Sequence, residues 1–108
     1  MDYHSRVLHL DIISDVICPW CFIGKRKLDA ALGEVEDLRV NLIWRPFQLD
    51  PTTPPSGYDR RKQMDERFGS DGARKLADNI LVAADGTGIN FAFDQIERTP
   101  NTLNAHRL

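Results

Sequence analysis

The sequence predicts an α/β fold in which a strand–helix–strand unit precedes a mostly helical segment. Two observations predict this class. Runs of alternating apolar and polar residues lie on both sides of a stretch with helical periodicity, and a connection rich in Pro and Gly then leads into charged, helix-like sequence. We expect the first unit to occupy residues 1–50 and the second to occupy residues 51–108.

The first strand is predicted over residues 7–14. Leu8, Leu10 and Ile12 alternate there with His9 and Asp11, which is typical of a strand with one buried face. The two polar residues should therefore lie on the opposite face of the sheet.

A helix is predicted from Pro19 to Val35. Proline suits the first helical position, because its ring fixes φ and its missing N–H would have no intrahelical partner there. Six residues of this stretch recur at intervals of three and four and so share one helix face, which should point toward the core. They are Cys21, Gly24, Leu28, Ala31, Leu32 and Val35.

A second strand is predicted over residues 38–45, where Leu38, Val40, Leu42 and Trp44 alternate with polar residues. A right-handed crossover would make the two strands parallel and place the helix on one face of their sheet. The first strand would then end at the edge where open α/β sheets hold their functional sites.

The second unit begins after a connection rich in Pro, Thr, Ser and Gly that starts at residue 46. Residues 58–68 predict a short exposed helix, and another helix should begin at residue 70 or 71 and end near residue 86 or 88. Residues 89–93 alternate as a short extended piece. Thr99-Pro100-Asn101 predicts the start of a final helix.

Both cysteines of the sequence lie where the first strand gives way to the helix. Two residues separate Cys18 from Cys21. A helix N-terminus carries a partial positive charge and unpaired N–H groups, which stabilise an anion. We therefore expect the pKa of Cys18 to lie below the ordinary value of about 8.5, so that Cys18 is the nucleophile and Cys21 the shielded resolving thiol. Pro19 and Trp20 between them should tune this thiolate.

Three alternatives to this redox pair are less favoured: a structural disulfide, an inert reduced pair and a metal site. A structural disulfide of this spacing would close too short a loop to stabilise a fold much. A metal site would need further ligands, yet His4, His9 and His106 are scattered and no second cysteine pair follows. We therefore expect no metal ion. Asp15 should cap the turn before Cys18, which is favoured over its acting to repel the thiolate.

Composition excludes several partner classes. The 108 residues carry a net charge of -2, which is too balanced to indicate nucleic-acid binding or a polybasic membrane contact. Residues 1–6 show no basic leader, and no window reaches the roughly 18 apolar residues of a membrane span. We expect a cytoplasmic protein. In that reducing compartment a cysteine pair is more often catalytic or metal-binding than structural.

Three segments together resemble the DsbA-like thioredoxin-fold family, and specifically its FrnE-like branch of dithiol-disulfide oxidoreductases. Residues 11–25 (DIISDVICPWCFIGK) resemble the active-site segment of that branch. Residues 44–51 (WRPFQLDP) resemble the segment after its second strand, and residues 99–108 (TPNTLNAHRL) resemble its helical-domain motif.

This resemblance implies a thioredoxin-like βαβ unit followed by a DsbA-type helical insertion, and an enzyme that exchanges thiols and disulfides through Cys18 and Cys21. Its substrates would be protein or small-molecule thiols or disulfides. Glutathione would be a candidate electron donor or acceptor, with no other cofactor. The resemblance is also compatible with a homo-oligomer.

Members of this family are considerably longer than the present chain. We expect the C-terminal part of the thioredoxin fold, with its cis-proline loop, to be absent from these 108 residues, so that residues 51–108 form an incomplete insertion. Such a chain should bury little apolar surface and exchange disulfides weakly on its own.

Two other functional classes stay open. Kappa-class glutathione transferases and 2-hydroxychromene-2-carboxylate isomerases resemble this chain, but they typically carry serine where Cys18 stands. A non-catalytic interaction module is the other alternative, because a small sheet leaves an edge unpaired.

Overall fold

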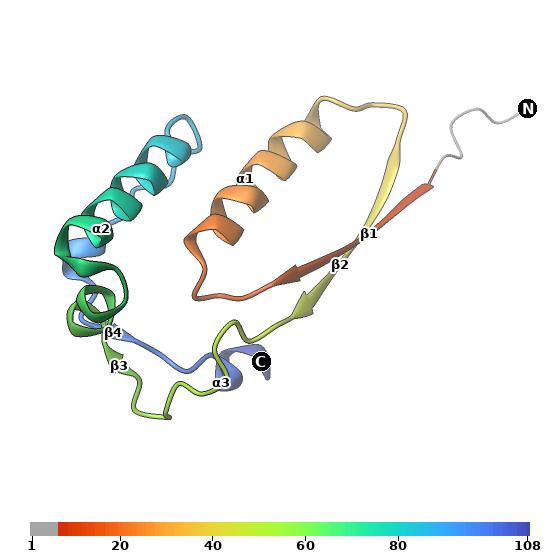
Figure 1. The fold of residues 1–108 in the computed structure, drawn as a ribbon. Coiled ribbons are helices and arrows are strands. Elements are labelled where there is room, and N and C mark those ends of the chain that lie inside the picture. Colours follow the sequence, from red (N-terminus) through yellow and green to blue (C-terminus); the bar gives the residue numbers. More distant parts are fainter. Residues whose placement is uncertain (1–6) are drawn as a thin grey trace, which may run out of the picture.

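The computed structural model describes residues 7–108. The expectations for His4 and for the start of the chain therefore fall on residues outside the described part. The first unit consists of strand β1 (Val7–Ser14), helix α1 (Pro19–Gly33) and strand β2 (Arg39–Pro46), as predicted. Figure 1 shows α1 running back along the two strands that it connects.

Strands β1 and β2 form the predicted parallel pair. Their register runs from Val7 opposite Arg39 to Ser14 opposite Pro46. Phe47 N–H extends the pairing by donating to Ser14 O at 3.0 Å. Both strands therefore end side by side, and the segments that follow them start from the same edge of the sheet. Within residues 7–108 this sheet has two strands.

Helix α1 begins where the sequence predicts and ends slightly earlier. Cys18 is its N-cap and Pro19 its first residue, while Gly33 is its last residue in place of Val35. The predicted apolar face is only partly right, because Ala31 and Val35 are exposed. The most deeply buried residue of α1 is Ile23, on a different face. Helix α1 has neighbours on two sides, so a single apolar face could not describe it.

The second unit contains strand β3 (Tyr58–Asp59), helix α2 (Arg60–Ala84), the 3₁₀ turn η1 (Phe93–Gln95), strand β4 (Arg98–Thr99) and helix α3 (Leu103–His106). Helix α2 breaks at Gly69, which has φ 71° and ψ 161°. This break lies where the sequence separates two helices, and a positive φ of this kind favours glycine. The Asp59 carboxylate caps α2 by accepting from Lys62 N–H at 2.9 Å.

Three details of the second unit differ from the sequence prediction. Tyr58–Asp59 and Arg98–Thr99 pair as short antiparallel strands that were not expected. Residues 89–93 do not form a strand, because the chain turns into η1 at Phe93 and stacks that ring on Phe91, with 5.0 Å between ring centroids. The final helix α3 is a single turn that starts at Leu103.

The core lies where α1 meets α2. Ile23, Ile80 and Ala84 are buried there, and partly buried Phe91 and Phe93 pack against them. Phe22 also meets Phe91 edge to face, with 6.1 Å between ring centroids. The core is therefore built from one helix of each unit.

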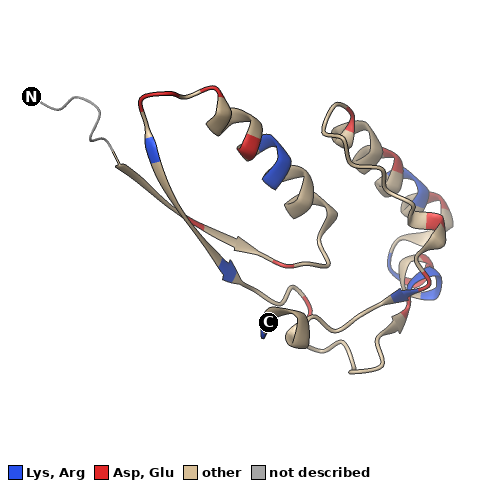
Figure 2. Cartoon of the chain, turned by 180° about the vertical axis from the view of Figure 1, so that it is seen from behind, with Lys and Arg blue, Asp and Glu red and all other residues tan. Residues whose placement is uncertain are grey.

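The described chain is elongated and leaves much of its sheet uncovered. Its radius of gyration is 17.4 Å, against about 13 Å for a compact domain of about 100 residues. Ile13 is 65% exposed, and Leu8, Ile43 and Trp44 are also exposed. Figure 2 shows basic and acidic residues interspersed along α2. No helix in residues 7–108 has both the length and the apolar character that crossing a membrane requires.

Candidate active site

The two cysteines lie at the carboxyl end of β1, where the chain turns into α1. Cys18 N–H donates to Asp15 O at 3.1 Å, which closes a tight turn, and Cys18 O accepts from Phe22 N–H at 3.3 Å as the first bond of the helix. Cys18 has the extended backbone of an N-cap, with φ −92° and ψ 112°. The strand-to-helix placement of the cysteine pair is therefore as the sequence predicts.

Exposure does not distinguish the two thiols. Cys18 and Cys21 are both free and both half-buried. Cys21 faces the sheet, as expected, and lines a hollow of about 240 Å³ with Ile12, Gly24 and Trp44. The stronger shielding that the sequence predicts for Cys21 is not seen in the described chain.

The pKa shifts of the two thiols do not match the sequence prediction. Burial raises the pKa of Cys18, and the hydrogen bond that its S–H donates to Cys21 raises it further, although the N–H groups of Cys21 and Trp20 act in the opposite direction. Burial also acts to raise the pKa of Cys21, but the N–H of Asp15, the Cys18 thiol and the Ser14 hydroxyl outweigh it and lower that pKa. The helix N-terminus is thus outweighed at Cys18 by burial and by the second thiol, and the pKa of Cys18 is raised where the sequence predicts a lowered one.

Asp15 has a larger role than the turn cap that the sequence predicts. The residue is only 3% exposed. Its Oδ2 accepts from Leu49 N–H at 2.9 Å, and its Oδ1 lies 3.0 Å from Nε2 of His106. Burial acts to raise the pKa of Asp15, but hydrogen bonds from Leu49, Thr102 and His106 lower it overall. The N–H of Ile17, in the turn before the dithiol, also lowers this pKa, so the carboxylate caps that turn as predicted and in addition contacts two distant segments.

His106 is a site residue that the composition and pattern of the sequence did not single out. Its Nε2 also lies 3.2 Å from Phe47 O, so that one nitrogen meets acceptors from two loops. The available signal was its place in residues 99–108, one of the three family-like segments. The structure brings all three segments together at Asp15.

Asn101 makes a second link between these segments. Its Nδ2 donates to Thr53 O at 2.6 Å, and its Oδ1 accepts from Gln48 Nε2 at 3.4 Å. The same oxygen accepts from Leu103 N–H at 2.9 Å at the start of α3. Residues 99–106 are therefore held against the loop that follows β2.

Exposed apolar side chains lie on the cysteine segment and on the loop after β2. Pro19 is half-buried, Trp20 is 50% exposed and Val16 is 68% exposed. Phe47 and Leu49 are exposed on the loop that contacts Asp15 and His106. Exposed aromatic and aliphatic groups beside thiols can contact an apolar part of a substrate.

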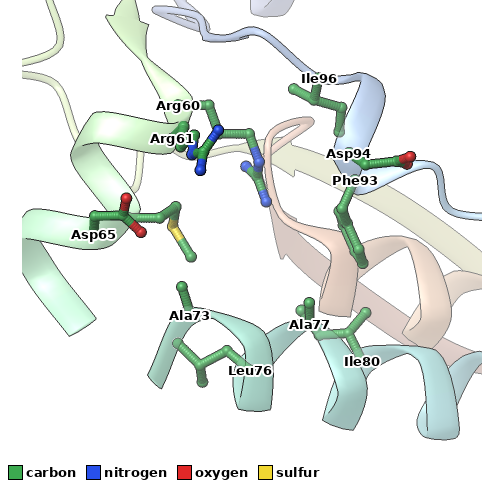
Figure 3. Close-up of a pocket in the computed structure, with 11 residues that line it drawn as sticks. Arg60, Arg61, Asp65, Ala73, Leu76, Ala77, Ile80, Phe93, Asp94 and Ile96 are labelled. Carbon is green, nitrogen blue, oxygen red and sulfur yellow. The ribbon is translucent and has the colours of Figure 1, made fainter. Parts of the chain in front are cut away.

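A separate and larger hollow, of about 370 Å³, lies between the two halves of α2 and the η1 segment (Figure 3). Its walls combine the apolar side chains of Leu76, Ile80 and Phe93 with charges of both signs, such as Arg60 and Asp65. None of its lining residues belongs to the segment that holds the cysteines. We place the candidate site at the dithiol, because the nucleophilic groups are there.

The described residues form no group of three or more His, Cys, Asp or Glu side chains that could hold a metal ion. Of the three histidines, His9 lies on β1 with its Nδ1 3.3 Å from Asn41 Nδ2, and His106 lies against Asp15. The two described histidines therefore have different neighbours.

Comparison with known proteins identifies the fold of this chain. A family model described as a DSBA-like thioredoxin domain matches residues 9–108. The chain is 38% identical over 95 residues to the uncharacterized protein YwbO of Bacillus subtilis (strain 168), a match that covers 88% of this chain and 42% of YwbO. It is also similar to the crystal structure of a probable DsbA oxidoreductase from Streptomyces coelicolor, with a TM-score of 0.78 and 26% sequence identity.

The structural match covers 92% of this chain and 44% of the Streptomyces chain. The present chain thus spans less than half the length of both relatives. The predicted fold class, a thioredoxin-like unit of mixed α/β structure with a helical insertion, is confirmed. The chain belongs to the family of DSBA-like thioredoxin domains.

Proposed function

We propose that this protein is a thiol–disulfide oxidoreductase that works through Cys18 and Cys21. The observation that carries the proposal is the placement of two free thiols, Cys18 at the N-cap of α1 and Cys21 in its first turn, at the carboxyl end of β1. Two thiols one helical turn apart can form a disulfide, and their protonation is coupled. A structural disulfide would not need this placement.

The proposed reaction begins with the proton between the two sulfurs. The Cys18 thiol transfers its proton to the Cys21 thiolate, and the Cys18 thiolate attacks one sulfur of a substrate disulfide. A Cys18–substrate disulfide forms and the other substrate sulfur leaves as a thiolate, which takes up a proton. Cys21 then loses its proton and attacks the Cys18 sulfur, which breaks the Cys18–substrate bond. The second substrate sulfur leaves as a thiolate and takes up a proton. The protein dithiol is oxidised to a disulfide, and the substrate disulfide is reduced to two thiols. The reverse sequence oxidises a substrate dithiol.

Pro19 and Trp20 tune this exchange in the proposal. Pro19 starts the helix directly after Cys18 and so keeps Cys18 at its tip. The N–H of Trp20 lowers the pKa of Cys18, against the burial that raises it. The exposed Trp20 ring offers an apolar surface next to the attacking sulfur.

We further propose that the protein belongs to the FrnE-like branch. Two segments that resemble that branch support this finer assignment. Leu49, in residues 44–51, and His106, in residues 99–108, both contact Asp15 of the active-site segment. We propose protein or small-molecule thiols and disulfides as substrates, glutathione among them, and a cytoplasmic location, with no nucleic acid or membrane as partner. The half-buried dithiol is open enough for a small disulfide to approach.

The decisive experiment compares Cys18→Ser with Cys21→Ser after incubation with oxidised glutathione. Cys21→Ser should accumulate a mixed disulfide on Cys18, visible by mass spectrometry as a glutathione adduct, because it lacks the resolving thiol. Cys18→Ser should lose turnover. His9→Ala, which keeps both cysteines and changes an exposed residue of β1, is the control and should turn over. Equal residual turnover in the two cysteine variants would contradict the dithiol mechanism.

A further inference from the structure

The backbone of Asp15 contacts both cysteines. Its carbonyl oxygen accepts from Cys18 N–H at 3.1 Å. Its own N–H faces the sulfur of Cys21 and stabilises the thiolate there. A small displacement of residue 15 would therefore change the surroundings of both thiols.

The side chain of Asp15 holds this backbone in place from the other side. The carboxylate is buried, and each of its oxygens has a partner from a distant segment: Leu49 N–H at 2.9 Å and His106 Nε2 at 3.0 Å. A buried carboxylate is costly unless it is hydrogen-bonded, so these two partners, together with Thr102 and the N–H of Ile17, decide where it lies.

The environment of His106 determines which of its nitrogens carries hydrogen. Its Nε2 faces Asp15 Oδ1 at 3.0 Å and Phe47 O at 3.2 Å, and both of these atoms are acceptors. Nε2 must therefore be protonated to satisfy them. The His106 side chain is 12% exposed, so little water can replace either bond. Helix α3 is thereby tied to the loop after β2 and to the turn before the dithiol.

We infer that Asp15 and His106 are a positioning pair for the dithiol, in which the histidine holds the carboxylate and the carboxylate fixes the peptide groups that contact Cys18 and Cys21. This inference rests on the proposed dithiol function. The pair acts through the backbone of residue 15, so neither side chain needs to touch the substrate. Residues at the end of the helical segment thus control the reactivity of thiols in the first unit.

The test compares His106→Gln with His106→Asn. The Gln amide can place an N–H donor near the position of Nε2, whereas the shorter Asn amide cannot reach Asp15. The readouts are the pH dependence of iodoacetamide alkylation of the reduced protein and the equilibrium of the dithiol with glutathione. We expect His106→Asn to shift alkylation to higher pH and to change the equilibrium constant about tenfold, which equals about 30 mV. His106→Gln should keep both values close to those of the wild type.

Asp15→Asn is the second variant, because the partners of the carboxylate are donors and an amide nitrogen would face at least one of them without a bond. A positioning role predicts that alkylation shifts to higher pH, as in His106→Asn. A purely electrostatic role predicts the opposite shift, because a nearby negative charge that raises the pKa of Cys21 has been removed. The opposite shift would overturn the inference.

The controls are the exposed residues His9→Ala and Asp11→Asn on β1, which should leave both readouts unchanged. Wild-type profiles in both Asp15→Asn and His106→Asn would also overturn the inference. Absence of exchange in the wild-type protein would instead refute the proposed function, so the two failures are distinguishable. Melting curves accompany each variant. If His106→Asn does not fold, the direction of the Asp15→Asn shift still decides.

Discussion

The ring of Phe22 on α1 meets Phe91, which follows α2, edge to face with 6.1 Å between centroids. The same Phe91 stacks on Phe93, and both rings pack on the buried cluster of Ile23, Ile80 and Ala84. These aromatic contacts connect the helix that carries the cysteines to the helical segment.

Phe91→Ala should therefore destabilise the protein by about 2 kcal/mol, below the usual loss for a fully buried Phe because the ring is only half-buried. Urea unfolding curves would measure the change. Phe68→Ala is the matched control, since Phe68 is exposed and should matter little. Equal losses from the two substitutions would mean that the aromatic contacts do not hold the units together.

Gly57→Ala should also be destabilising, by about 1–3 kcal/mol. Gly57 has φ +77°, and an added Cβ would lie 2.6 Å from Thr99 O, a backbone atom that the β3–β4 pairing holds in place. Thermal unfolding would show the loss as a lower melting temperature.

Gly24→Ala provides the comparison for Gly57. A Cβ at Gly24 would meet no atom within 4 Å, and alanine favours the interior of α1 by roughly 0.8–1.0 kcal/mol. A melting temperature that rises for Gly24→Ala and falls for Gly57→Ala is the expected result. If Gly57→Ala is neutral, the close approach to Thr99 is not a constraint.

Cys21→Ala should lower the pKa of Cys18. Burial, the largest cause that raises this pKa, remains in the variant, but the hydrogen bond to Cys21 and its charge are removed. The Cys18 thiolate would then appear at lower pH, and the rate of alkylation against pH would move in that direction. Ser14→Ala should instead raise the pKa of Cys21 by removing a hydroxyl donor. An unchanged or higher Cys18 pKa in Cys21→Ala would refute the coupling of the two thiols.

Acid should weaken the fold through Asp15. Its pKa in the folded protein is lowered, so the unfolded chain binds more protons and stability rises with pH. The contribution is complete above the unfolded value of about 3.9 and is lost as pH falls through the lower folded value. Urea unfolding between pH 7 and acid should show this decline in the wild type and less of it in Asp15→Asn. Asp11→Asn, whose carboxylate is exposed and pairs with Arg45 at 3.2 Å, should keep the wild-type slope.

Local patterns in the sequence were sufficient for much of the first unit. The alternation in residues 7–14 predicts β1, and Pro19 after Cys18 marks the start of α1. The break at Gly69 was also predictable, because Ser70 and Asp71, which directly follow it, are favoured N-cap residues for a second helix. In contrast, residues 89–93 alternate like a strand but turn into η1. Packing Phe91 and Phe93 on the core stabilises the fold more than pairing this segment in a sheet would.

The sequence by itself determined the order of strand, helix and strand and the placement of Cys18 and Cys21 at a helix N-terminus, because these features depend on residues close together in the chain. Only the tertiary structure decided that the pKa of Cys18 is raised and that of Cys21 lowered, since burial and the second thiol act on Cys18 while contacts with Ser14 and Asp15 act on Cys21. It also decided that His106 meets Asp15 across 91 residues. No local periodicity encodes such a contact, which exists because the folded chain brings the end of β1, the loop after β2 and α3 to one place.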